Sequence, residues 1–299
     1  PVATAARRSP YSRAAAEPQC GFCACPKASN AADVPGSAAY NVGMTASSTA
    51  TDSDTPSQPW ATTAATLADG EMPPGWSLVN SSSYARVAYH AGDQVYFKLF
   101  LPRSPLESIK ALARGSRATR ARQHNENLRR AGITAPHNIA WGQLQKGREY
   151  LFSTAVPGLG IDRWLRHELP AGHRDGLPRR RKLLRELGIF VGRLHHSGFI
   201  HGDLRTGNVL AEWQGGRFRF ALIDNERNSR HDMPPGKLVL KNLMQLNMHT
   251  PEELSRADRW RFFESWRRQM RDLSRLEATI LGNEAYNWAM QRLQQKRQS

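Results

Sequence analysis

A polar loop and an aspartate that follows it carry the clearest chemical signal in this 299-residue chain. The loop reads HGDLRTGN over residues 201–208, and Asp224 follows the apolar run FALI at 220–223. A carboxylate such as Asp203 can orient an attacking hydroxyl group and accept its proton. Oxygen ligands such as Asn208 and Asp224 are those that Mg²⁺ takes when it bridges phosphates. These residue types and their spacing predict phosphoryl transfer, with Asp203 as the base and with Asn208 and Asp224 as metal ligands.

The elements around the loop are expected to position these side chains. Apolar residues recur at helical spacing before the loop and predict a helix over about residues 180–196. Residues 209–213 and 218–223 are β-prone runs on either side of a Gly-Gly turn, and they predict a hairpin. Asn208 precedes the first strand and Asp224 follows the second, so antiparallel pairing brings both to the same end. This placement favours a catalytic loop over the alternative, a structural polar turn.

A lysine in the first half of the chain completes the predicted site. Lys98 lies inside the β-prone run VYFKLFL at 95–101, and a cation with apolar neighbours needs a partner. We therefore expect Lys98 to bind phosphate in a cleft rather than to project into solvent from an edge strand. Glu126, on a helix predicted over about residues 106–131, is the expected partner of Lys98, and Glu107 is its rival.

The loop that would cover the phosphates is poor in glycine. Residues 80–83 (NSSS) stand where glycines would let backbone N–H groups approach a nucleotide. Ser82 and Ser83 are the residues of this loop that we expect to contact the nucleotide.

Composition divides the chain into three parts. Residues 1–70 are rich in Ala, Ser, Thr and Pro without a sustained apolar period, so we expect them to be disordered. The three cysteines lie in this part, in CGFCAC at 20–25, and lack the fourth ligand of a zinc site. Strands with one helix are expected over 71–156, and helices with one hairpin over 157–299. The sequence thus predicts an α+β fold with two lobes of unlike composition and a cleft between them.

The chain is strongly basic, with a net charge of +16; the first 70 residues carry −1, so residues 71–299 carry +17. Such a field concentrates nucleotides, nucleic acids, acidic lipids and phosphorylated sugars, without choosing between them. No recognised nucleic-acid-binding motif accompanies the charge. The sequence has no run of about 18 apolar residues and no apolar stretch typical of a secretory signal. We therefore expect a cytoplasmic protein without a transmembrane segment.

Several segments of the chain match the pattern of a known family. They extend from about residue 76 to 275 and include VYFK (95–98), NENLRRAGITAP (125–136), FIHGDLRTGNVL (199–210) and LIDNER (222–227). Together they resemble the bacterial lipopolysaccharide core kinases (Kdo and heptose kinases), which belong to the protein-kinase-like superfamily. The resemblance implies a two-lobed kinase that uses ATP and Mg²⁺ to phosphorylate a sugar of the lipid-linked core oligosaccharide. Such an enzyme would work at the cytoplasmic face of the inner membrane, in peripheral contact with it.

The same resemblance implies a role for each matching residue. Lys98 would bind the phosphates of ATP with Glu126 as its partner, and Asp203 would be the base. Asn208 and Asp224 would hold Mg²⁺.

The chain departs from the protein-kinase pattern at two points in this region. Gly202 replaces the arginine of HRD, and DNE at 224–226 replaces DFG. Both departures suit a kinase of small molecules that lacks an activation-loop switch. Glu226, within DNE, is expected to pair with Arg227 or Arg230 rather than to bind metal.

The sequence leaves two other functions open. A small-molecule kinase of the aminoglycoside or choline type shares the HGDL…GN loop, but the basic charge favours an anionic acceptor over a cationic antibiotic. The other is a catalytically weak kinase fold that serves as a binding module. The glycine-poor loop favours this reading, and the full set of Lys98, Asp203, Asn208 and Asp224 argues against it.

Overall fold

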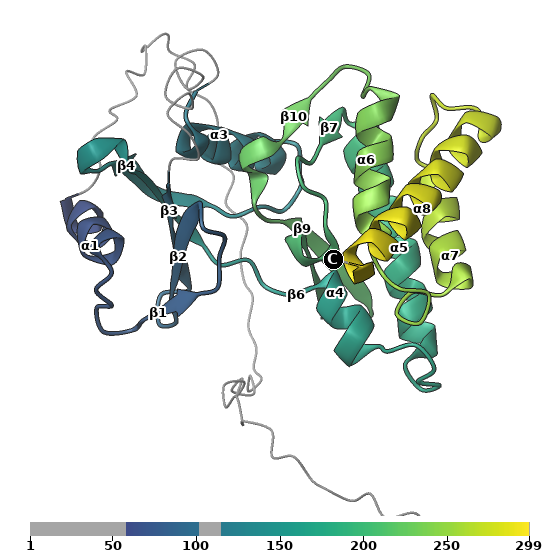
Figure 1. The fold of residues 1–299 in the computed structure, drawn as a ribbon, viewed down its shortest axis with the longest axis horizontal. Coiled ribbons are helices and arrows are strands. Elements are labelled where there is room, and N and C mark those ends of the chain that lie inside the picture. The colour runs from purple at the N-terminus through teal and green to yellow at the C-terminus, as the bar shows by residue number, and fades with distance from the viewer. Residues whose placement is uncertain (1–57, 102–114, 299) are drawn as a thin grey trace, which may run out of the picture. The chain divides into compact units, whose positions relative to one another are not determined.

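The computed structural model describes residues 58–101 and 115–298 (Figure 1). In its N-terminal lobe, antiparallel strands form one sheet in the order β1-β2-β3-β5-β4. The helix α3 (Arg117–Arg130) lies against this sheet, and Ser116 caps the helix by accepting a hydrogen bond from the Thr119 N–H group. The strands are β1 (Trp76–Val79), β2 (Ala85–His90), β3 (Val95–Phe100), β4 (Asn138–Gln143) and β5 (Glu149–Thr154).

The central strand β3 directs its side chains alternately to the two faces of the sheet. Phe97 and Leu99 are buried on the face that is covered by helix α1 (Gln58–Asp69). Phe100 is buried on the opposite face, in a cluster with alanines of α3. Lys98 has the parity of Phe100, so its side chain leaves the sheet on the side of α3.

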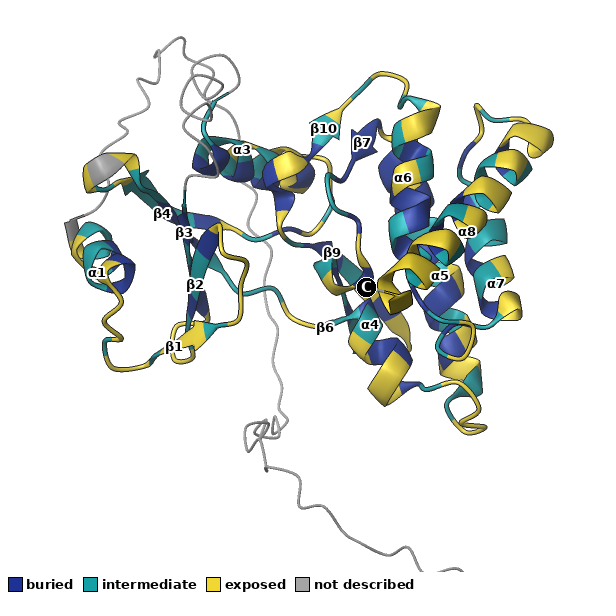
Figure 2. Cartoon of the chain, viewed as in Figure 1, coloured by how far each residue is buried: buried dark blue, intermediate teal, exposed yellow. Residues whose placement is uncertain are grey.

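Helix α1 corrects the prediction that residues 1–70 are disordered, which is wrong for residues 58–69. Ala64 and Leu67 of this helix are fully buried against the sheet, as the dark face of α1 in Figure 2 shows. Packing of an apolar face orders a helix whose local composition alone would not. Residues 1–57, with Cys20, Cys23 and Cys25, lie outside the described residues.

The C-terminal lobe is mainly helical. The long helix α5 (Leu177–His196) packs along α7 (Arg256–Arg267), and α6 (Gly236–Leu246) packs on α8 (Arg275–Gln298). Gly188 permits the close approach of α5 to α7, because a Cβ atom there would collide with the carbonyl oxygen of Phe262. Helix α5 confirms the helix predicted over about residues 180–196. Its close contact with α7 holds it in place ahead of the loop that precedes the hairpin.

Small strands and helical turns frame that loop. The predicted hairpin is confirmed as β8 (Val209–Gln214) and β9 (Arg217–Leu222), with β6 (Leu159–Gly160) alongside β8. The strands β7 (Phe199–Ile200) and β10 (Ser229–Arg230) pair with each other, and in the sequence they precede and follow the loop and hairpin. The remaining short turns are α4 (Ile161–Arg163), η1 (Gln145–Gly147), η2 (Trp164–Glu168), η3 (Thr206–Asn208) and η4 (Asn225–Arg227).

The predicted α+β architecture is confirmed, with an antiparallel sheet in the N-terminal lobe and a mainly helical C-terminal lobe. The division between the lobes at residues 156 and 157 stays a prediction.

A buried histidine joins α5, α6 and α7 in the core of the C-terminal lobe. The indole N–H of Trp266 donates to His195 Nδ1 (3.1 Å), and His195 Nε2 lies 3.2 Å from Asn242 Oδ1. All three side chains are fully buried. Burial lowers the pKa of His195 from 6.5 to about 4, despite the hydrogen bond with Asn242, so the ring is neutral in the folded protein.

We expect His195 to make the fold sensitive to acid. Because its pKa of about 4 in the folded state lies below the ordinary 6.5, the unfolded chain takes up this proton first as the pH falls. The stabilisation is fully present above pH 6.5 and is lost as the pH approaches 4, by about 3 kcal/mol in total. Urea unfolding between pH 7.5 and 4 measures it, with His195→Gln as the variant that cannot titrate at this site. The prediction fails if both proteins lose stability equally over that range.

Candidate active site

A cleft between the sheet of the N-terminal lobe and the hairpin of the C-terminal lobe encloses a cavity of about 740 Å³. Its walls come from the β1–β2 loop, strand β3, the segment after β5, the loop before β8 and the segment after β9. The charged and polar residues that line it include Ser81, Ser82, Lys98, Asp203, Arg205, Asp224 and Glu226. The cavity thus brings together charged side chains from strand β3, from the loop before β8 and from the segment after β9.

The backbone around Asp203 is held by the histidine that precedes it. The Asp203 N–H group donates to His201 Nδ1 (3.0 Å), so the ring proton lies on Nε2, which donates to the Ile223 carbonyl (3.0 Å). Burial lowers the pKa of His201, so this ring stays neutral and keeps both bonds. The residue between His201 and Asp203 must be a glycine, because a Cβ atom at Gly202 would overlap Arg227. The loop is therefore tied to the end of β9.

Two side chains hold the carboxylate of Asp203. Arg205 Nε lies 3.0 Å from each oxygen, and an Arg205 terminal nitrogen lies 2.7 Å from Oδ2. On the other side, Gln245 Nε2 of α6 donates to Asp203 Oδ1 (3.0 Å). The Arg205 side chain is 66% exposed, so it can leave Asp203 at little cost. The carboxylate is thus oriented by the partly buried Gln245 amide and by the exposed Arg205 guanidinium.

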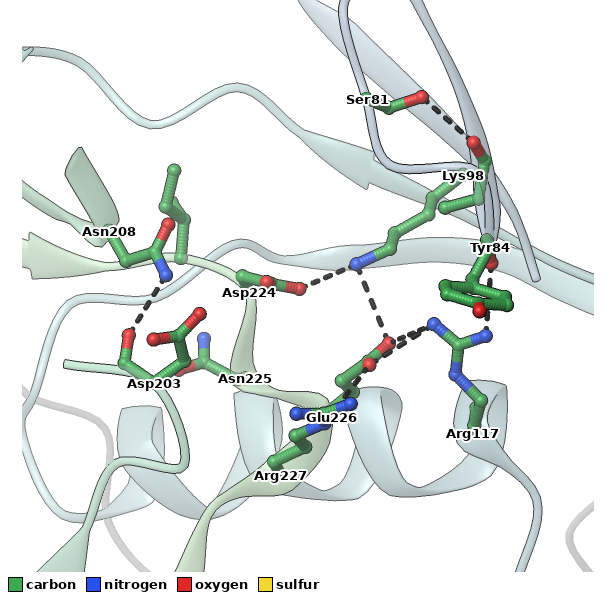
Figure 3. Close-up of polar contacts among 12 residues, drawn as sticks. Ser81, Tyr84, Lys98, Arg117, Asp203, Asn208, Asp224, Asn225, Glu226 and Arg227 are labelled. Atoms are coloured by element: carbon green, nitrogen blue, oxygen red, sulfur yellow. Dashed lines mark hydrogen bonds and ion pairs between the residues drawn. The ribbon is translucent and has the colours of Figure 1, made fainter. Parts of the chain in front are cut away.

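The hairpin brings Asn208 and Asp224 to the same end, as the sequence predicts. Val209 pairs with Leu222, and the Ile223 N–H group donates to the Asn208 carbonyl (3.1 Å). The Asn208 amide nitrogen donates to the Asp203 carbonyl oxygen (2.9 Å), which turns its Oδ1 away from Asp203 (Figure 3). Among the described residues, none donates a hydrogen bond to that oxygen. Asp224 adopts a left-handed backbone conformation, with φ of 60° and ψ of 50°.

Lys98 reaches across the cleft to this end of the hairpin. Its Nζ lies 2.6 Å from Asp224 Oδ1 and 3.6 Å from Glu226 Oε2. Burial acts to raise the pKa of Asp224, but the ion pair and hydrogen bond with Lys98, together with His201 and Arg117, lower the pKa below its ordinary value. Asp224 is therefore ionised, and Lys98 lies in the cleft as predicted rather than in bulk solvent.

The predicted partner of Lys98 is wrong. Glu126 faces Arg122, Arg130 and the Asn138 amide, which lies 3.1 Å from Glu126 Oε1. The carboxylate that reaches Lys98 from deeper in the site is Glu226, because α3 presents its Arg117 end, rather than Glu126, to the cleft. The rival Glu107 lies outside the described residues.

Glu226 is bound more extensively than the sequence suggests. Both of its oxygens accept from the same terminal nitrogen of Arg117 (3.1 Å each), and Arg227 Nε lies 3.7 Å from Oε1. The expected pair with Arg227 is thus present, but Arg117 is the closer partner. Arg117 and Glu226 are both almost fully buried. A basic residue at a helix start gives no sequence signal for this role.

The β1–β2 loop forms one wall of the cavity. Ser82 lines it together with Asn80 and Ser81, and the Ser81 hydroxyl donates to the Ala85 carbonyl (2.8 Å), which fixes the turn. Ser83 is not among the described residues that line the cavity. The structure therefore places Ser82, rather than Ser83, beside the space that a ligand would fill.

The oxygen atoms at the hairpin end suit a hard cation. Asp224 offers a carboxylate and Asn208 an amide oxygen that no described residue engages. In the described part of the chain, no three His, Cys, Asp or Glu side chains are arranged to hold a metal ion. Mg²⁺ commonly takes only one or two protein ligands and completes its shell with water and substrate phosphates. The donor set fits Mg²⁺ bound in that way.

We expect Glu226 to be essential to the fold at the site and Glu126 to be dispensable. Glu226→Gln leaves Arg117 buried without its counter-charge and should lower the free energy of unfolding by about 3 kcal/mol. Glu126→Gln removes only partly exposed pairs and should cost less than about 1 kcal/mol. Urea denaturation measures the free energy of unfolding of the two variants, which carry the same Glu→Gln change. Equal losses, or a larger loss for Glu126→Gln, would contradict the assignment of Glu226 as the counter-charge of the buried Arg117.

Comparison with known structures finds several similar chains at low sequence identity. WaaP in complex with acyl carrier protein has 19% identity and a TM-score of 0.49, over 73% of this chain and 88% of that one. WbdD has 19% identity and a TM-score of 0.45, over 71% of this chain and 45% of that one. The aminoglycoside phosphotransferase APH(3'')-Id from Streptomyces rimosus has 18% identity and a TM-score of 0.44, over 78% and 99%.

A search of curated proteins gives no significant match. The sequence model of the Lipopolysaccharide kinase (Kdo/WaaP) family, by contrast, matches residues 75–266. This span is well over half of the chain, and it contains both walls of the cleft and every site residue discussed above. The chain therefore belongs to the lipopolysaccharide kinase (Kdo/WaaP) family, and it is a kinase.

Proposed function

We propose that this kinase transfers the γ-phosphoryl group of ATP to a hydroxyl group of a Kdo or heptose sugar in the lipopolysaccharide core. The observation that carries the proposal is the meeting of Asp203, Asp224 and Lys98 in one cleft of a chain from this family, with Asn208 hydrogen-bonded to the Asp203 carbonyl beside it. No single motif supplies this set, because its members lie on two lobes and on both sides of the hairpin.

The cleft offers a place for the nucleotide. Its volume of about 740 Å³ falls within the range of ligand pockets, and the β1–β2 loop with Ser82 forms one wall. Lys98 Nζ already lies near the hairpin end, 2.6 Å from Asp224. A polyphosphate that enters between them would take this ammonium group as its counter-charge. Asp224 would then give up a hydrogen bond that it now receives from Lys98.

The hairpin end would hold the metal. Asp224 and Asn208 would hold Mg²⁺, and the ion would supply positive charge to neutralise the phosphates of ATP. The turn η4 and the loop before β8 keep these two side chains in place through the strand pairing described above.

Asp203 would accept the proton of the acceptor. As the acceptor oxygen forms its bond to the γ-phosphorus, the bond from that phosphorus to the bridging oxygen breaks, and ADP leaves. The hydroxyl proton passes to a carboxylate oxygen of Asp203. Arg205 now covers that carboxylate, so it must turn away before the hydroxyl group can approach.

The charge of the chain supports an anionic acceptor. A net charge of +16 would draw an acidic, lipid-linked sugar toward the cleft and would repel a cationic aminoglycoside. None of the helices in the described ranges is long and apolar enough to cross a membrane. We propose that the chain meets its lipid-linked acceptor by peripheral contact with the inner membrane, on its cytoplasmic face.

We expect substitutions of the two aspartates to separate chemistry from binding. Asp203→Ala should lower kcat by about 10²–10⁴-fold, the usual contribution of a positioned proton acceptor, and leave nucleotide affinity nearly intact. Asp224→Ala should abolish turnover and weaken Mg·ATP binding, because the metal loses its charged ligand. Isothermal titration with Mg·ATP and turnover assays on both variants measure this difference. Equal loss of nucleotide affinity in both would show that the roles are assigned wrongly.

The acceptor assay compares three substrates with purified protein and ATP. Core oligosaccharide fractions that contain Kdo and heptose should be phosphorylated, and an aminoglycoside and choline should not. Asp203→Ala run beside the wild type shows that the activity belongs to this site. Phosphorylation of the aminoglycoside or choline alone would replace the proposed acceptor, and the absence of transfer to any of them would favour the binding-module alternative.

A further inference from the structure

Helix α6 contacts the proposed base directly, through a residue that lies outside the loop of residues 201–208. Gln245 lies on the last turn of α6, and its amide nitrogen donates to Asp203 Oδ1 (3.0 Å). Its amide oxygen accepts from the backbone N–H group of the next residue, Leu204 (3.0 Å). One side chain thus binds both the carboxylate and the backbone of the loop that carries it.

The orientation of this amide is set by a chain of hydrogen bonds that begins in the core. The indole of Trp266 can only donate, so His195 Nδ1 must accept its proton, and His195 Nε2 must therefore donate to Asn242 Oδ1. The Asn242 amide nitrogen then faces Gln245 Oε1 (3.3 Å), which leaves the nitrogen of Gln245 for Asp203. Each hydrogen bond in this series has only one possible donor and acceptor, and the last of them is donated to Asp203, the proposed base.

Burial stabilises this series of hydrogen bonds. Trp266, His195 and Asn242 are fully buried, where a broken hydrogen bond is costly. Asn242 also clasps the backbone of His201, since its nitrogen donates to the His201 carbonyl (2.7 Å) and its oxygen accepts from the His201 N–H group (3.2 Å). Helix α6 therefore holds both the loop before Asp203 and the carboxylate of Asp203.

We propose that Gln245 is a positioning residue for the phosphoryl transfer, one that aims the Asp203 carboxylate at the acceptor hydroxyl group. The inference rests on the proposed function, because it assigns Gln245 a part in the work of Asp203. When Arg205 turns away to admit the acceptor, Gln245 is the contact that still holds Oδ1. Oδ2 is then left to meet the hydroxyl group in a fixed direction, as orientation-dependent catalysis requires.

Two substitutions distinguish aiming of the carboxylate from mere support of the loop. Gln245→Met keeps the length of the side chain but removes both hydrogen bonds. Gln245→Glu keeps an oxygen for the Leu204 N–H group and turns a second, negatively charged oxygen toward Asp203. If Gln245 only supported the loop, the Glu variant would be closer to wild type than the Met variant. If it aims the carboxylate, the Glu variant is the worse of the two.

We expect Gln245→Met to lower kcat by about tenfold, the loss that follows from one charge-assisted hydrogen bond, with KM for ATP unchanged. Gln245→Glu should lower kcat further. The matched control is Lys241→Met, a substitution at an exposed position on the same helix, which should leave kcat within about twofold of wild type. The loop-support order, with Gln245→Glu more active than Gln245→Met, would overturn the proposal, as would a change confined to KM.

A double-mutant cycle completes the test. In an Asp203→Ala background, Gln245→Met should have almost no further effect on kcat, because the group it aims is gone. Independent, multiplying losses would show that Gln245 acts on the fold and would reject the inference. The wild type and Asp203→Ala alone report on the function itself. If the wild type transfers no phosphate, or Asp203→Ala keeps full activity, both proposals fail; if only the Gln245 variants behave as wild type, the positioning role alone fails.

Discussion

The buried carboxylate of Glu226 is the charge on which the geometry of the cleft depends. Its side chain is 6% exposed and is neutralised by Arg117 from α3 and by Lys98 from β3. A desolvated carboxylate is tolerated only with such partners, so both cations must come to it. Since Glu226 follows the hairpin and the cations belong to the other lobe, this one group links the two sides of the cleft beside the Lys98–Asp224 ion pair.

The same constraint explains why α3 is so basic and polar for a helix that lies between a sheet and a second lobe. The His124 ring donates to the Asn225 carbonyl (2.8 Å), and Asn125 accepts from the Asn225 amide (2.8 Å). Burial lowers the pKa of His124, which keeps the ring neutral in this contact. The polar face of α3 thus covers the turn η4, while its alanines face the sheet. A polar helix surface is here an interface between lobes rather than a solvated face.

The sequence predicts those parts of the site that follow from local pattern. The hairpin and the loop before it can be read from β-prone runs, a Gly-Gly turn and the spacing of Asp203 and Asn208, because strand pairing brings sequence neighbours together. The partner of Lys98 cannot be read in this way. The sequence favours Glu126 and gives no sign that Glu226 approaches Lys98, because the rotation of α3 about its axis, set by packing of its alanines, decides which carboxylate faces the lysine. Helix α1 is missed for the same reason, since contact with the sheet orders it.

The two aspartates of the site depend on different parts of the fold. Asp224 is bound by a lysine of the other lobe, so its surroundings change if the lobes separate. The contacts of the Asp203 carboxylate described above, by contrast, come from Arg205 and Gln245 within its own lobe. The Asp203 carboxylate is thus held by contacts within one lobe, whereas the Lys98–Asp224 contact spans two. Opening of the cleft to exchange nucleotide would then cost the site its Lys98–Asp224 contact without disturbing the direction of Asp203.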